Sequence, residues 1–194
     1  MSAASPEVWR IVFLGPPNSG KGTQAVRLAA ELRVPAISTG EMLRAAVAAG
    51  SPLGLRVEGV LASGDLVGDD LMADVVVDRL GQADARQGFI LDGYPRTPAQ
   101  AETLAQIISG QDVALDAVLL VEAPEETLVQ RALGRGREDD REEIIRERLR
   151  VYREKTAPLI DFYAAAGILH QIDGNLSIEE VGRLIRTALG AGRG

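Results

Sequence analysis

Short apolar runs recur along the chain at intervals that leave room for a helix between them. The run at 11–14 is rich in β-branched residues and ends at a glycine, and apolar residues fill 117–121 between two acidic ones. Similar short runs occupy 34–37, 88–92 and 168–172. Continuous apolar runs of this length are typical of strands buried on both faces of a parallel sheet. The pattern therefore predicts a strand at each of these places.

The segments between these runs carry helical signals. Apolar residues recur at the spacing of one helix face within 20–32, which predicts a helix there. Residues 38–41 and 177–180 match the capping box that begins a helix, and Pro124 is predicted to open another helix at its first position. Alternating strands and helices predict an α/β fold, a three-layer α/β/α sandwich around a five-stranded parallel sheet.

Two stretches interrupt the alternation. Residues 39–67 have a helical, glycine-punctuated pattern without a strand, which predicts a small inserted helical subdomain. The short charged segment 134–140 is predicted to be a loop between two helices. We expect a frayed tail at 1–8, which lacks the basic and apolar regions of a secretion signal, and a disordered tail at 190–194. No run approaches the ~20 apolar residues that a membrane-spanning helix needs.

Composition narrows the classes of function. The 194 residues fit one domain, and 21 basic against 28 acidic residues give a net charge of −7. Such a chain is a poor candidate for binding nucleic acid or an anionic membrane. It has no cysteine and one histidine, His170, which excludes disulfides, thiolate metal sites and multi-histidine metal centres. A cytoplasmic location is the expectation. Only two of the basic residues are lysines, Lys21 and Lys155.

Lys21 lies in a glycine-rich segment between the first predicted strand and the first predicted helix. Residues 15–23 match the phosphate-binding pattern G-x-x-x-x-G-K, except that Gly22 follows the lysine and the hydroxyl of Thr23 comes one position later. Glycines let backbone N–H groups turn inward as an anion nest, and the helix N-terminus adds partial positive charge. The lysine supplies a compact charge to β- and γ-phosphates. The strand–loop–helix context disfavours the alternative, a glycine-rich turn with an exposed lysine.

The sequence Gly-Lys-Gly-Thr-Gln at 20–24 departs from the general phosphate-loop pattern, and in this respect it resembles the nucleoside monophosphate kinases. Four further blocks fit in the same order: Ser-Thr-Gly-Glu-Met-Leu-Arg at 38–44, Gly-Asp-Leu-Val at 64–67, Phe-Ile-Leu-Asp-Gly-Tyr-Pro-Arg-Thr at 89–97 followed by Gln100, and an arginine-rich segment at 131–148. Over residues 9–189 the sequence resembles adenylate kinases of the short-lid type. The block at 89–97 is the most specific of the five.

The resemblance implies roles for particular residues. On the ATP side it implies Asn18, Ser19, Gly20, Lys21, Gly22, Thr23, Arg131, Arg135 and the backbone carbonyl of Leu176. On the AMP side it implies Thr39, Arg44, Asp65, Leu66, Val67, Gly93, Tyr94, Pro95, Arg96, Gln100, Arg137 and Arg148. The catalytic charges would be Lys21, Arg96, Arg135, Arg137 and Arg148. Asp92 would hold Mg²⁺ through water, and no zinc is expected. Asp139 and Asp140 are either solvated charges of the loop or, as we prefer, a lid pair that orients arginines on closure.

The resemblance also implies a division of the chain. A core would comprise 1–37, 68–133 and 141–194, with an NMP-binding insertion at 38–67 and a short lid at 134–140. Only Gly136 separates Arg135 from Arg137, so the lid would be a minimal loop. Closure of such a loop with its helix would exclude water from the site.

The implied activity is reversible, Mg²⁺-dependent phosphoryl transfer from ATP to AMP, giving two ADP, in a monomer whose partners are small nucleotides. Positioning and cations dominate such a transfer, because its transition state is loose. Thr39 and Gln100 favour adenine, since a carboxamide can accept from N6 and donate to N1, but an amide can flip. A UMP/CMP kinase of the same fold therefore stays open. A non-catalytic phosphate-loop module is the other alternative, although a second cluster of arginines argues against it.

Overall fold

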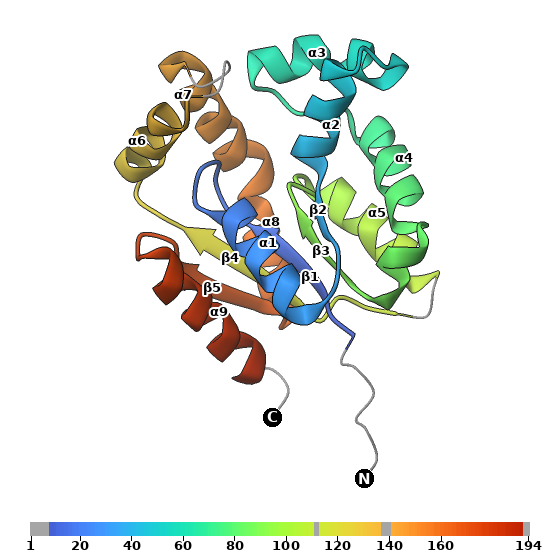
Figure 1. The fold of residues 1–194 in the computed structure, drawn as a ribbon, viewed down its shortest axis with the longest axis vertical. Helices are drawn as coiled ribbons and strands as arrows, with labels where there is room; N and C mark the ends of the chain where they lie inside the picture. The colour runs from blue at the N-terminus through green and yellow to red at the C-terminus, as the bar shows by residue number, and fades with distance from the viewer. Residues whose placement is uncertain (1–7, 111–112, 137–140, 192–194) are drawn as a thin grey trace.

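The computed structural model describes residues 8–110, 113–136 and 141–191. Its centre is a parallel five-stranded sheet in the order β2-β3-β1-β4-β5, seen at an angle in Figure 1. The strands are β1 (Arg10–Leu14), β2 (Ala36–Ser38), β3 (Phe89–Asp92), β4 (Ala117–Glu122) and β5 (Leu169–Asp173). The predicted fold class, an α/β sandwich around a five-stranded parallel sheet, is confirmed.

Helices cover both faces of the sheet (Figure 1). They are α1 (Lys21–Leu32), α2 (Thr39–Ala48), α3 (Pro52–Ser63), α4 (Asp69–Leu80), α5 (Pro98–Ser109), α6 (Glu125–Arg135), α7 (Glu142–Val151), α8 (Pro158–Ala165) and α9 (Ile178–Ala191), with a 3₁₀-helix η1 (Ala83–Gln87) and a π-helix η2 (Tyr152–Thr156). The residues of β1 alternate between two cores. Ile11 and Phe13 pack with α1 and α9, whereas Val12 and Leu14 pack with α4, α5 and α8. This alternation requires apolar residues at every position of the strand, because both faces are buried.

The second strand begins two residues later than the sequence pattern predicts. Arg33 ends α1 in a left-handed conformation, with φ 58°, and the N–H of Val34 still donates to the Ala29 carbonyl over 3.1 Å. Val34 is thus used to terminate α1, and the first hydrogen bond to β3 goes from the Ile90 N–H to the Pro35 carbonyl over 2.9 Å, so that β2 begins at Ala36. The other strands begin and end within one residue of their predicted positions.

Helix ends also differ in part from the sequence prediction. The helix predicted to begin at Ser38 is confirmed, because Ser38 is the residue before α2. Within the described residues the Ser38 side chain makes no capping hydrogen bond, so the capping box itself does not form. Pro124 is the residue before α6 rather than its first residue. The box at Ser177 is confirmed, because the Ser177 N–H donates to Glu180 Oε2 (3.0 Å) and the Glu180 N–H to Ser177 Oγ (3.3 Å). The last helix continues to Ala191, where a disordered tail was expected from 190 onward.

The first predicted interruption of the alternation follows β2, and the second lies between α6 and α7 in the chain. Residues 39–63 form α2 and α3, and the fully described stretch 39–67 contains no strand, as predicted. Gly134 and Arg135, expected in a loop, form the last turn of α6, and Gly136 ends that helix with φ 69°. Arg137, Asp139 and Asp140 fall outside the described residues. No described helix has the length and apolar character that crossing a membrane would take.

Candidate active site

A cleft of about 840 Å³ lies at the carboxyl ends of the central strands, the edge where open parallel sheets bind ligands. In Figure 1 α2 and α3 stand on one side of it, and α6 and α7 on the other. Among the residues predicted for the site, those lining the cleft are Asn18, Ser19, Gly20, Lys21, Gly22, Thr23, Thr39, Arg44, Asp65, Leu66, Val67, Asp92, Gly93, Pro95, Arg96, Gln100, Arg131, Arg135, Arg148 and Leu176. Segments far apart in the sequence are thus brought together.

Tyr94 is the predicted residue that the structure places elsewhere. Its side chain is 1% exposed and packs in the core beneath α5 and α8, and it does not line the cleft. Within the described residues its hydroxyl has no hydrogen-bond partner. The side chain of Tyr94 is therefore part of the core, while its neighbours Gly93 and Pro95 line the cleft.

The phosphate loop is a compact turn between β1 and α1. Asn18 and Gly20 have φ values of 66° and 100°, and the Ser19 N–H donates to the Pro16 carbonyl over 3.3 Å. Gly15, with φ 137°, lies so close to the Val121 carbonyl oxygen of β4 that a side chain there would collide with backbone. These conformations turn the loop toward the N-terminus of α1, which is the arrangement that favours anions.

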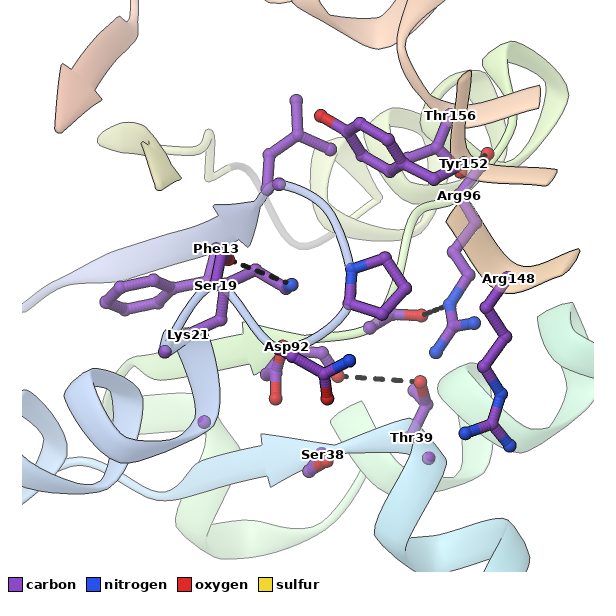
Figure 2. Close-up of a pocket in the computed structure, with 18 of the residues that line it drawn as sticks. Phe13, Ser19, Lys21, Ser38, Thr39, Asp92, Arg96, Arg148, Tyr152 and Thr156 are labelled. Carbon is purple, nitrogen blue, oxygen red and sulfur yellow. Dashed lines mark hydrogen bonds between the residues drawn. The ribbon is translucent and has the colours of Figure 1, made fainter. Parts of the chain in front are cut away.

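Lys21 folds back over this loop. Its Nζ donates to the Pro16 carbonyl over 2.6 Å, and Figure 2 shows the residue beside Asp92 and Ser19. Burial lowers the pKa of the Lys21 ammonium to about 8, although the Asp92 carboxylate opposes the shift and the Arg96 guanidinium adds to it. The side chain is therefore protonated at neutral pH and lies among charges of both signs.

Arginines gather on the other side of Asp92. Arg96 Nε donates to the Gly93 carbonyl over 2.8 Å, and in Figure 2 the Arg96 and Arg148 side chains run next to each other into the cleft. Burial lowers the pKa of Arg96; Asp92 opposes this shift, while Arg148 and Arg44 increase it. Like charges held this close repel each other, so the cluster favours an anion with several negative oxygens.

Two residues of the π-helix η2 belong to the site, although sequence reasoning missed them. Tyr152 and Thr156 line the cleft, and Thr156 Oγ1 donates to the Arg96 backbone carbonyl over 2.9 Å. A π-helical turn is often found at functional sites. No spacing of apolar residues signals such a turn, so the sequence pattern contained no warning of it.

Gln100 lies at the start of α5 and is 2% exposed. Its Oε1 accepts from the Arg96 N–H over 2.7 Å, and its Nε2 donates to Asp69 Oδ1 over 2.7 Å. Thr97 caps the same helix, because its Oγ1 accepts from the Gln100 N–H over 3.2 Å. Sequence reasoning missed Asp69, whose position in the first turn of α4 is typical of an ordinary helix-terminal acid.

A family model described as adenylate kinase matches residues 13–168, which is most of the chain. The chain belongs to the adenylate kinase family.

Curated relatives match a larger part of the chain than the family model does. The adenylate kinase of Xanthomonas oryzae pv. oryzae (strain MAFF 311018) is 54% identical over 185 residues, which are 93% of this chain and 99% of the relative. That of Xanthomonas euvesicatoria pv. vesicatoria (strain 85-10) is 52% identical over 185 residues, again 93% and 99%. The adenylate kinase of Prochlorococcus marinus (strain MIT 9211) is 49% identical over 181 residues, 93% of this chain and 97% of the relative.

These findings confirm the predicted family and the predicted enzyme class, a phosphotransferase of the nucleoside monophosphate kinases. They favour neither alternative, the UMP/CMP kinase or the non-catalytic module, because the relatives just described all bear the name adenylate kinase.

Proposed function

We propose that this chain transfers the γ-phosphoryl group of ATP to AMP reversibly, with Mg²⁺, and yields two ADP. The observation that carries the proposal is the meeting of two cationic groups in one cleft. Lys21 on the phosphate loop and Arg96 in the arginine cluster both interact electrostatically with Asp92. A phosphoryl group that moves from one nucleotide to another lies between the cations that bind the donor and the cations that bind the acceptor.

The donor nucleotide is assigned to the loop side. Residues 18–23 would surround the ATP phosphates, with Lys21 on the β- and γ-phosphates. Arg131, whose Nη1 is 3.5 Å from the Ser19 carbonyl oxygen, and Arg135 extend that side. The exposed Leu176 precedes α9 at the cleft edge, where its backbone carbonyl would accept from adenine.

The acceptor is assigned to the arginine side. Thr39, Arg44, Arg96, Gln100 and Arg148 would bind AMP and present its phosphate in line with the donor. An oxygen of the AMP phosphate forms the bond to Pγ, while the bond from Pγ to the bridging oxygen breaks and its electron pair stays on ADP. That nucleophile is already ionised at neutral pH, so no general base is required.

Asp92 fits a residue that holds Mg²⁺ through water. A side chain added at Gly22 would lie 3.4 Å from Asp92 Oδ2, so the carboxylate is next to the phosphate loop and the start of α1. Mg²⁺ prefers oxygen ligands, keeps several waters and usually takes one or two carboxylates together with substrate phosphates. When bound, the ion supplies positive charge to the transferred group.

The division of the chain and its setting are part of the proposal. We assign 38–67 to an AMP-binding insertion, 134–140 to a short lid, and 1–37, 68–133 and 141–194 to the core. The helices α2 and α3, which follow β2 without an intervening strand and pack on each other, support the first assignment. The setting that we propose is a monomer in the cytoplasm, where its substrates would be free nucleotides.

A coupled assay of ADP formation tests the activity, with ATP as donor and AMP, CMP, UMP and GMP as acceptors. AMP is expected to have the highest kcat/KM. A higher value with CMP or UMP would replace the adenylate assignment with a pyrimidine-nucleotide one. No transfer to any of the four would leave only nucleotide binding.

A further inference from the structure

The side-chain amide of Gln100 is held at both of its ends. The Arg96 N–H can only donate, and it meets Oε1 at 2.7 Å, whereas a carboxylate oxygen of Asp69 accepts from Nε2 at 2.7 Å. A flipped amide would place its NH₂ against the Arg96 N–H and its oxygen against the carboxylate. Both contacts would then be repulsive, so the partners allow one orientation.

Asp69 is itself held in place. It is the first residue of α4, where the helix N-terminus favours a negative charge. Thr97 Oγ1 lies 3.3 Å from each carboxylate oxygen, and the same Oγ1 accepts from the Gln100 N–H. Asp69 thus links the start of α4 to the start of α5. Its contacts with Thr97 orient the carboxylate toward Gln100.

Half of the hydrogen-bonding capacity of Gln100 remains for a ligand. A carboxamide has two N–H donors and two acceptor lone pairs, and the contacts with Asp69 and Arg96 use one of each. The residue lines the cleft. Adenine offers an acceptor at N1 beside a donor at N6, which pairs with the remaining N–H and lone pair. Hypoxanthine and guanine offer a donor at N1 beside an acceptor at O6, which would need the flipped amide.

We propose that Asp69 is a positioning residue that determines base specificity: by orienting the Gln100 amide, it selects a 6-aminopurine over a 6-oxopurine at the acceptor site. The inference rests on the proposed function, in which Gln100 meets the base of AMP. A glutamine alone could present its amide to the base in either orientation. Here Asp69 and the Arg96 N–H fix which orientation Gln100 adopts.

Asp69→Asn tests the proposal with the smallest change of shape. An asparagine can present either NH₂ or oxygen to Gln100, so one of the two constraints is lost while the Arg96 N–H remains. We expect kcat/KM for IMP relative to AMP to rise roughly tenfold to a hundredfold, the range of one hydrogen bond to a charged group. The KM for AMP should change by about twofold at most if half of the amides stay in the AMP orientation. The KM for ATP should change little, because Asp69 contacts Thr97 and Gln100 on the acceptor side.

The control is Asp70→Asn. Asp70 is exposed, follows Asp69 in the first turn of α4 and carries the same charge. Its substitution should leave the IMP-to-AMP ratio at the wild-type value. The ratio is measured on one preparation with two acceptors, so a loss of folded protein affects both values equally and does not alter it.

The outcomes separate this inference from the proposed function. A wild-type enzyme that forms no ADP from AMP would overturn the proposed function, and the assignment of Asp69 with it. An active wild-type enzyme whose Asp69→Asn variant keeps the original ratio would overturn the role of Asp69 alone. The same holds if Asp70→Asn changes the ratio as much as Asp69→Asn does.

Discussion

At one end of the cleft an unbroken segment, 15–23, turns its backbone toward the start of α1, with a single lysine folded over it. At the other end, side chains from separate elements meet: Thr39 and Arg44 from α2, Arg96 from the turn after β3, Gln100 from α5 and Arg148 from α7. The loop end depends on backbone conformation, whereas the acceptor end depends on which side chains the fold brings together. We therefore expect substitutions at the loop end and at the acceptor end to lower the enzymatic activity by different factors.

The two lysines of the chain give the largest expected contrast. Lys21→Met removes the cation of the phosphate loop, and kcat should fall on the order of 10²–10³-fold, as for a single preorganised donor. Lys155 is the matched control, because it is 44% exposed, pairs with Asp65 at 2.9 Å and does not itself line the cleft. Lys155→Met should change kcat by less than about twofold, since exposed ion pairs contribute little. Equal losses in an ADP-formation assay would contradict the assigned role of Lys21.

At the acceptor end, Arg96→Lys keeps the charge and removes the planar fork that donates to the Gly93 carbonyl. We expect kcat/KM for AMP to fall about a hundredfold and the KM for ATP to change little. Arg153→Lys is the control, because Arg153 is exposed and pairs with Glu125 at 2.7 Å. If steady-state kinetics gave the two variants the same kcat/KM for AMP, the acceptor end would not depend on guanidinium geometry.

The pH profile distinguishes the loop end from the acceptor end, because the lowered pKa of about 8 belongs to Lys21. As pH rises through that value the ammonium loses its proton, so kcat/KM for ATP should be about tenfold lower at pH 9 than its neutral plateau. The free energy of unfolding is expected to change in the opposite direction to kcat/KM. The unfolded chain, with a lysine pKa of 10.5, binds more protons between pH 8 and 10.5, so the free energy of unfolding should rise there.

Both pH effects can be measured on the wild-type protein. Initial rates should show kcat/KM for ATP decreasing above pH 8, and urea unfolding should show the free energy of unfolding increasing over the same pH range. Lys155→Met should keep the decrease in kcat/KM above pH 8. A profile that stays flat to pH 10 in the wild type would show that the charge of Lys21 does not limit ATP use in this range.

The smallest effect is expected at Thr156→Val, which removes the donor to the Arg96 carbonyl while keeping the side-chain shape. Leaving this carbonyl without its partner should cost about 1–2 kcal/mol in the free energy of unfolding and raise the KM for AMP a few-fold. Thr103→Val is the control, because Thr103 Oγ1 donates over 2.9 Å to the Ala99 carbonyl of its own helix. Urea unfolding and AMP kinetics would disprove the link to Arg96 if both variants behaved alike.

The sequence by itself determined the features whose signals lie within a few residues of each other. Apolar runs located the strands, the Ser177–Glu180 box located the start of α9, and glycine spacing beside Lys21 located the phosphate loop. Physical reasons of short range suffice there: backbone conformation, alternation of burial and capping. The acceptor residues could be named in advance only through a family resemblance, since an arginine on a helix is more often a solvated residue.

Tertiary structure alone decided the contacts between distant segments. Asp69 and Gln100 are 31 residues apart, and Thr156 and Arg96 are 60 apart, yet each pair shares a hydrogen bond. Tyr94 turned into the core although both neighbours face the cleft, and α6 continued through Arg135 until Gly136 adopted a left-handed conformation. No local pattern encodes such contacts, because they depend on how the strands and helices stack. The sequence named the amide at Gln100; the packing of α4 against α5 decided which way it points.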